Sequence, residues 1–292
     1  MHLAGNVGNR VVYLNVKNSL KHFAKGTLNF EDINVTFLNK YEVWLASDKT
    51  DREGCSPSTI NQYIRTIRAI FNKAISRDII SLEIYPFRNQ ANPKGYSLAH
   101  LKSEPAYRAL SIEELKKFKN FDVGKNEELA NPYYYFMFMY YCRGLNWTDL
   151  CHLKRKDIRN GRVYYTRQKT KKKFSIKLSE PLQHILDQFD KSALYVFPIL
   201  SSFHKSPTQK QNRIKKCLKQ VNSDLKLIAM KLGIEPNLST YAARHTYAMS
   251  LKRGGINMNV ISDALGHADI KVTKHYLSRF EDEVIDAADS VL

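Results

Sequence analysis

The chain has few of the features that hold a secreted or membrane-spanning protein together. It has four cysteines and no C-x-x-C pair, too few to suggest a disulfide scaffold, and a reducing cytoplasm is therefore the expected compartment. Its most apolar run, Y-Y-Y-F-M-F-M-Y-Y-C at 133–142, is too short to cross a bilayer, and we interpret it as a buried helix. The N-terminus also lacks the charged and then apolar pattern of a signal peptide.

Acidic residues are scarce. The chain has 28 Asp and Glu against 46 Lys and Arg, which gives a formal charge of +18. This balance favours a polyanionic partner, because basic charge of this size drives association with nucleic acid through counterion release. A soluble protein with an unusual isoelectric point is the alternative. The length of 292 residues predicts two domains.

The first part of the chain has helical patterns. Ser56 is a good N-cap with Pro57 in the first turn, and apolar residues then follow one helix face: Ile60, Ile64, Ile67, Phe71 and Ala74. An earlier helix is expected at 35–45, with a core face of Phe37, Leu38, Tyr41 and Trp44. Three basic residues lie off the first stripe, where they either contact a DNA backbone or are simply solvated: Arg65, Arg68 and Lys73.

The helical period is lost between residues 85 and 110, where prolines and a glycine gather among basic residues. We interpret 88–110 as a linker between a helical core-type DNA-binding domain at 1–87 and a second domain at 111–292. The second domain opens with clear signals of a helix start, namely the capping box of Ser111 and Glu114 and the hydrophobic staple of Leu110 and Leu115.

Residues 157–178 depart from helical periodicity inside the second domain. Asn160-Gly161 is a favoured hairpin turn, V-Y-Y-T follows it, and F-S-I-K-L alternates after a lysine cluster. We therefore expect a mainly α fold with a small antiparallel β-sheet, an α+β domain. The helical pattern then returns with a buried stripe of Leu182, Ile185, Leu186 and Phe189, and Gly254-Gly255 ends the helix that carries Arg244.

Residues 241–276 contain the chemistry. They read Y-A-A-R-H, then L-G-H, then K-H-Y-L. An arginine offers a fork of donors that fits phosphate oxygens, an imidazole is a further donor or proton carrier, and a tyrosine hydroxyl can attack phosphorus. Each of these residues alone is more often structural, but together they suggest phosphodiester chemistry that needs no metal.

The order and spacing of these motifs resemble the end of the catalytic domain of tyrosine recombinases, the phage-type integrase family. That family has H-x-x-R, then L-G-H, then a nucleophilic tyrosine. The resemblance covers nearly the whole chain and implies a core-binding domain, a linker and a catalytic domain. It implies a site-specific recombinase that cleaves and rejoins double-stranded DNA through a 3′-phosphotyrosine intermediate, without a cofactor, to integrate, excise or invert a mobile element.

The resemblance assigns roles to individual residues. Tyr276, nine residues after His267, takes the place of the nucleophile, and Arg244 that of the second catalytic arginine, which stabilises the non-bridging oxygens. Lys169, in T-R-Q-K-T, resembles the hairpin lysine that protonates the leaving 5′ oxygen, although it has basic neighbours in the same loop. Lys171 and Lys172 are expected to bind DNA.

Two departures from the family pattern stand out. Tyr241 replaces the usual histidine, and a tyrosine can donate to phosphate but is a poor proton acceptor near neutral pH, so His267, held after a capping Gly266, gains importance. In the pattern G-L-R-x-x-E-L, Asn146 stands in the place of the first catalytic arginine.

One turn before Asn146 lies Arg143. We expect it to reach the same phosphate oxygen, with a capping or surface role as the alternative. Asp149 takes the place of the family's acidic residue and is expected to buttress one of the arginines. The displaced arginine and the Y-x-x-R-H variant resemble integrases of Bacteroides-type mobile elements.

The resemblance also implies partners. We expect a C-shaped clamp on double-stranded DNA and a homotetramer on DNA, with a monomer in solution as one option. Accessory DNA-bending proteins and a cytoplasmic, nucleoid-associated location are also expected. The acidic tail at 280–292 either docks on a neighbouring protomer or folds back on its own domain. Integrases often carry a further N-terminal arm-binding domain with no counterpart here, so the chain is either a short form or a fragment.

Other functions compete with this interpretation. A non-catalytic, sequence-specific DNA-binding regulator is the first, because 260–277 superficially resembles a helix-turn-helix, although that leaves Arg244 and Lys169 without a role. A metal-dependent nuclease using His245, His267 and His275 lacks a pair of carboxylates. A type IB topoisomerase would share the chemistry without the pairing of protomers.

Overall fold

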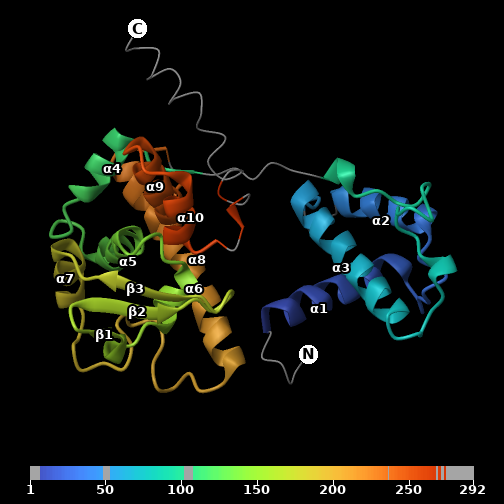
Figure 1. Ribbon diagram of the computed structural model, residues 1–292, viewed down its shortest axis with the longest axis horizontal. Coiled ribbons are helices and arrows are strands. Elements are labelled where there is room, and N and C mark those ends of the chain that lie inside the picture. The colour runs from blue at the N-terminus through green and yellow to red at the C-terminus, as the bar shows by residue number, and fades with distance from the viewer. Residues whose placement is uncertain are drawn as a thin grey trace, which may run out of the picture. The chain divides into compact units, whose positions relative to one another are not determined.

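The computed structural model describes residues 7–48, 53–101, 108–235, 237–267, 269–270 and 273. The chain divides into two compact units, Met1–Pro105 and Ala106–Leu292 (Figure 1). Both units are mainly helical, and the second contains one small antiparallel sheet, which is the fold class expected from the sequence. Among the described residues, none of the helices combines the length and the apolar character that a membrane span requires.

As far as the structure describes it, the first unit contains three helices, α1 (Val7–Ala24), α2 (Val35–Ala46) and α3 (Pro57–Ile75), followed by two 3-10 turns, η2 (Leu82–Ile84) and η3 (Ala99–Leu101). The predicted start of α3 is confirmed, because the Ser56 hydroxyl accepts a hydrogen bond from the backbone N–H of Thr59. The predicted apolar stripe of α3 is buried in the core of this unit.

Residues 88–101 lie in this first unit. The backbone N–H of Tyr96 donates to the carbonyl of Pro86 at 2.8 Å, and the N–H of Arg88 donates to the carbonyl of Tyr96 at 3.0 Å. The side chains of Tyr96 and Leu101 are buried in the same core as α3. This part of the expected linker is therefore folded, and it lacked a sequence signal because a buried irregular turn has no period.

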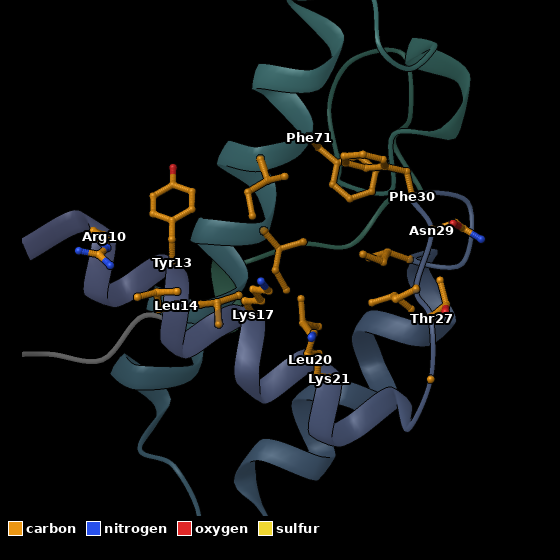
Figure 2. Close-up of a pocket in the computed structure, with 16 residues that line it drawn as sticks. Arg10, Tyr13, Leu14, Lys17, Leu20, Lys21, Thr27, Asn29, Phe30 and Phe71 are labelled. Atoms are coloured by element: carbon orange, nitrogen blue, oxygen red, sulfur yellow. The ribbon is translucent and has the colours of Figure 1, made fainter. Parts of the chain in front are cut away.

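A groove of about 920 Å³ runs between α1 and α3 in the first unit (Figure 2). Its lining is mainly apolar, with Leu14, Leu20 and Phe71 among the lining residues and basic side chains from α1 beside them. Among the described residues that line it, none carries a carboxylate, an imidazole or a thiol. The groove offers apolar surface rather than acid–base groups, so the chemistry suggested by the sequence has to be sought in the second unit.

The second unit holds seven α-helices and two 3-10 turns within the described residues: α4 (Ile112–Lys119), η4 (Glu127–Leu129), α5 (Ala130–Tyr141), α6 (Trp147–His152), η5 (Arg155–Asp157), α7 (Glu180–Asp187), α8 (Pro207–Lys231), α9 (Thr240–Arg253) and α10 (Met258–Leu265). The predicted capping box is confirmed, because Ser111 and Glu114 each accept the other's backbone N–H. The apolar run at 133–142 forms the buried helix α5, which packs against α9.

Three strands form the sheet in the order β1 (Ile158–Arg159), β2 (Arg162–Thr166) and β3 (Lys173–Lys177), all antiparallel. Asn160 and Gly161 have φ values of 50° and 65°, as a two-residue hairpin turn requires. Thr166 pairs with Lys173 at the far end of the second hairpin. The turn between β2 and β3 therefore presents residues 167–172 beyond the sheet.

Candidate active site

Arg244 is buried in the second unit, with 3% of its surface exposed. Its Nη1 donates to the carbonyl of Gly144 at 2.8 Å and its Nη2 to the carbonyl of Leu265 at 2.5 Å. Gly144 has φ +66°, and a Cβ atom there would lie 2.9 Å from Cγ of Arg244. A glycine is therefore required at position 144 for two reasons: the backbone is left-handed there, and α9 approaches it closely.

His267 follows the end of α10. As predicted, Gly266 caps this helix in the left-handed conformation, with φ +68°, and a side chain at Gly266 would collide with the ring of Phe174 in β3. The capping glycine thus lets the end of α10 approach the sheet. Nε2 of His267 lies 3.2 Å from Nη2 of Arg244, so the L-G-H and Y-x-x-R motifs meet in space.

The partners of His267 define its tautomer. A guanidinium can only donate, so Nε2 must be the acceptor, and the ring proton then resides on Nδ1, which donates to Oγ1 of Thr273 at 2.8 Å. Burial and, to a smaller extent, the positive charges of Arg244, Arg167 and Lys172 together lower the pKa of His267 to about 4. The imidazole is therefore neutral near pH 7.

A second guanidinium, that of Arg167, lies at the same place. Its Nη1 donates to the carbonyls of Leu265 and Gly266, both at 3.2 Å. The Asn146 amide, with its oxygen turned toward this guanidinium, accepts from Nε and Nη2 at 3.1 Å each. We refer to Arg167, Arg244 and His267 as the arginine–histidine cluster.

The sequence reasoning missed Arg167. Two signals were present: an arginine in T-R-Q-K-T, two residues before Lys169, and an asparagine where the family has its first arginine. Only the fold connects these two signals, because the hairpin turn brings position 167 against position 146.

Lys169 lies in the turn between β2 and β3, and its side chain is exposed. Asp149 is buried, with 5% of its surface exposed, and its Oδ1 accepts from the backbone N–H of Gln168 at 2.8 Å. Asp149 therefore anchors the hairpin turn next to Arg167. Lys171 is exposed on the same turn, and Lys172 pairs with Asp263 at 3.4 Å.

Two further candidates, Arg143 and Tyr241, are not part of the arginine–histidine cluster. Arg143 is half-buried with φ +56° and lies near Tyr247, whose pKa is raised by burial and lowered in part by this charge. Tyr241 is 50% exposed, and its ring packs edge-on against His245 at 4.7 Å between centroids. Within the described residues, neither candidate is hydrogen-bonded to the arginine–histidine cluster.

The predicted nucleophile, Tyr276, falls outside the described residues. Three expected DNA-binding residues are in the first unit, on α3, where Arg65 and Lys73 are exposed and Arg68 is half-buried. The groups that the structure brings together are thus two guanidinium groups and one neutral imidazole, all at the C-terminal end of α10.

Solved structures share this architecture. The Tn1549 transposon integrase, in a complex with a circular intermediate DNA, superposes with a TM-score of 0.65 at 17% identity and covers 94% of this chain and 91% of its own. A lambda integrase dimer bound to a COC′ core site superposes with a TM-score of 0.55 at 16% identity and covers 90% of this chain and 70% of its own. At these identities the similarity shows the fold.

Relatives are found along most of the sequence. A tyrosine recombinase of Pseudothermotoga lettingae is 24% identical over 282 residues, which is 95% of this chain and 89% of the relative. Tyrosine recombinase XerD of Rickettsia bellii is 26% identical over 297 aligned residues, 89% of this chain and 88% of the relative.

Two family patterns divide the chain between them. Residues 1–92 match the phage integrase SAM-like domain, and residues 110–283 match the phage integrase family. The second match contains the hairpin, α9 and α10, and so all the members of the arginine–histidine cluster. The chain belongs to the phage integrase family of tyrosine recombinases.

Proposed function

We propose that this protein is a site-specific recombinase that cleaves and rejoins DNA, with Tyr276 as the nucleophile and with Arg244, His267 and Lys169 around the scissile phosphate. The observation that supports this proposal most is the 3.2 Å contact between Arg244 and His267. These two residues belong to separate sequence motifs, and they meet at the end of α10. Tyr276 follows Thr273 by three residues, a span of at most about 11 Å, and Thr273 contacts His267.

The chemistry would proceed by attack of the phenolic oxygen of Tyr276 on phosphorus. A bond forms between that oxygen and phosphorus while the bond from phosphorus to the 5′ oxygen breaks. The phenolic proton leaves to an acceptor, for which the neutral Nε2 of His267 is suited once phosphate engages the neighbouring guanidinium. The departing 5′ oxygen takes a proton from the ammonium of Lys169, which leaves a 5′-hydroxyl and a 3′-phosphotyrosine.

Rejoining is the reverse of this step. A 5′-hydroxyl attacks the phosphotyrosine and gives its proton to the amine of Lys169, while the bond from phosphorus to the phenolic oxygen breaks and the phenol takes its proton back from His267. The number of phosphodiester bonds is conserved, so no high-energy cofactor is consumed. Integration, excision and inversion of a mobile element all use this chemistry, and we propose that the natural reaction is one of these.

We also propose that the active assembly is a homotetramer on double-stranded DNA. Lambda integrase has been solved as a dimer on a core site and as a tetramer on a Holliday junction. Exposed Arg65 and Lys73 on α3 offer phosphate contacts from the first unit. The Y-A-A-R-H motif and the missing arginine at Asn146 support a finer assignment to integrases of Bacteroides-type mobile elements.

A DNA-binding regulator without catalysis is not favoured. A regulator needs basic surface, whereas Arg244 is buried and is in contact with a neutral histidine. Burying the Arg244 guanidinium has a desolvation cost. Binding of a phosphate at the active site gives this buried group a function that a regulator would not use.

The test has two stages. Duplexes bound by the Tyr276→Phe variant are first selected from a pool with a randomised region, and the selected duplex is then prepared with a nick at successive positions. Wild-type protein should form an adduct with one nicked form that survives SDS and EDTA, and Tyr276→Phe should form none. If the wild-type protein binds the selected duplex tightly and yields no adduct with any nicked form, the proposed function is wrong.

A further inference from the structure

We infer that Arg167 takes the role of the first catalytic arginine and binds the non-bridging phosphate oxygen that an arginine at position 146 would bind in the family pattern. The inference rests on the proposed recombinase function. It replaces the expectation from sequence that Arg143 fills this role.

The position of the Arg167 guanidinium is the first argument. It lies against the Asn146 amide, with Nε and Nη2 both 3.1 Å from the amide oxygen. Position 146 is where G-L-R-x-x-E-L requires arginine. The charged group that is missing from the helix start is therefore supplied by the hairpin, and an asparagine at 146 is short and neutral enough to leave room for it.

Its bonding is the second argument. In the part of the chain that the structure describes, Arg167 donates to neutral acceptors and forms no ion pair. Arg244 donates to one of the same carbonyls, that of Leu265. Two positive charges are thus held side by side by partial negative charges at the end of α10, and a phosphate diester with two non-bridging oxygens would satisfy both.

The backbone at Arg167 supplies the third argument. The N–H of Arg167 donates to the carbonyl of Lys172, and the N–H of Lys171 donates to the carbonyl of Arg167, both at 2.9 Å. The next residue, Gln168, is fixed to the buried carboxylate of Asp149 at 2.8 Å. Arg167 therefore projects from an anchored base, and such preorganisation is what electrostatic stabilisation of a transition state requires.

Arg143 lacks these features. It follows α5 in a left-handed conformation, with φ +56°, and its charge acts on Tyr247 and on Cys142. Within the described residues it is not hydrogen-bonded to Asn146 or to any member of the arginine–histidine cluster.

The experiment measures cleavage of the nicked duplex obtained by the selection described above. Arg167→Ala should lower the single-turnover rate by about 10²–10³-fold and leave DNA binding largely unchanged. Arg159→Ala is the matched control, because Arg159 is exposed on the same sheet and packs on Tyr164; it should cleave at the wild-type rate. Arg143→Ala should retain most of the activity.

Two variants of the experiment separate contact with phosphate from a structural role. Relocating the guanidinium in the double variant Asn146→Arg with Arg167→Ala should recover at least about tenfold of the loss. Replacing the scissile phosphate by a methylphosphonate removes its negative charge, so Arg167→Ala should be impaired far less on that substrate. A structural defect would persist in both cases.

The outcomes distinguish the two proposals. If the wild-type protein forms no adduct, the recombinase function itself fails. If the wild-type protein forms the adduct, Arg167→Ala cleaves normally and Arg143→Ala is inactive, the recombinase function stands and the assignment of Arg167 is wrong. An Arg167→Ala defect that neither the relocated arginine nor the methylphosphonate relieves also overturns the assignment.

Discussion

Arg167 and Arg244 donate hydrogen bonds to the same oxygen atom, the carbonyl of Leu265. One arginine comes from a hairpin turn and the other from α9, and the carbonyl belongs to the last turn of α10. The two positive charges repel each other, and partial negative charge between them offsets that repulsion. In the protein without DNA, the carbonyl at the end of α10 supplies this negative charge, and we expect a phosphate to supply it in the complex with DNA.

Substitution of Gly144 tests how closely α9 has to approach. Gly144→Ala places a methyl group 2.9 Å from Cγ of Arg244 and forces a side chain onto a residue with φ +66°. We expect the free energy of unfolding to fall by about 1–3 kcal/mol and cleavage to fall further, because Arg244 is displaced. Chemical denaturation and the adduct assay measure the two effects.

Gly233→Ala is the control for this substitution. Gly233 has a similar φ of +61°, but nothing lies within 4 Å of the added Cβ atom. It therefore reports backbone strain alone, with stability reduced and cleavage at saturating protein unchanged. Equal cleavage by the two variants would mean that the contact between Gly144 and Arg244 does not position the guanidinium.

The sequence predicted those parts of this site that depend on local structure. The hairpin turn at Asn160 and the cap at Gly266 follow from φ preferences that few residues satisfy. Arg167 could not be predicted in the same way, because its partners are carbonyls almost a hundred residues further along the chain. Such contacts are set by how the hairpin packs on α10, which no short-range pattern encodes.

The relation of Tyr241 to Arg244 shows a further limit of sequence patterns. A spacing of three on one helix favours a shared face, yet Tyr241 is 50% exposed and Arg244 is 3% exposed. Three residues turn a helix by about 300°, so the two side chains diverge by about 60°. At the edge of a buried face, that difference separates a side chain in solvent from one in the core.

The hydroxyl of Thr273 is expected to orient His267. Thr273→Val removes the acceptor for the proton on Nδ1 while keeping the shape of a fully buried side chain. The loss of one hydrogen bond of about 1.4 kcal/mol corresponds to a cleavage rate about tenfold lower. Single-turnover cleavage measures it, and Thr273→Ser, which keeps a hydroxyl, should stay close to wild type. If valine and serine variants cleave equally, the hydroxyl does not orient the ring.

Two exposed residues of α3, Arg65 and Lys73, are expected to contact the DNA backbone. Their double substitution by alanine should weaken binding and reduce the slope of log affinity against log salt by about 2, because each phosphate contact contributes about 0.9. Binding titrations over a range of salt concentrations measure the slope. Lys191→Ala removes a lysine that pairs with Asp187 on the surface of α7, and its slope should match wild type. An unchanged slope in the double variant would assign Arg65 and Lys73 to solvent.

Acid should destabilise the second unit through two histidines. Burial and the charge of Arg244 lower the pKa of His245 to about 3, and burial with neighbouring cations lowers that of His267 to about 4. Between these values and the ordinary pKa of about 6.5, the unfolded chain binds protons that the folded protein does not. The free energy of unfolding should therefore be highest above pH 6.5 and fall as pH decreases, by up to about 1.4 kcal/mol per pH unit for each group.

His267→Gln should flatten this pH dependence, and binding of the selected duplex should shift it. A phosphate beside the imidazole favours the protonated ring, so the pKa of His267, measured by NMR titration, should rise from about 4 when DNA binds to the Tyr276→Phe variant. His245 offers the internal comparison, because it is buried next to Arg244 on α9, is not hydrogen-bonded to His267 within the described residues, and should respond less. If DNA leaves the titration of His267 unchanged, the phosphate does not lie against the arginine–histidine cluster.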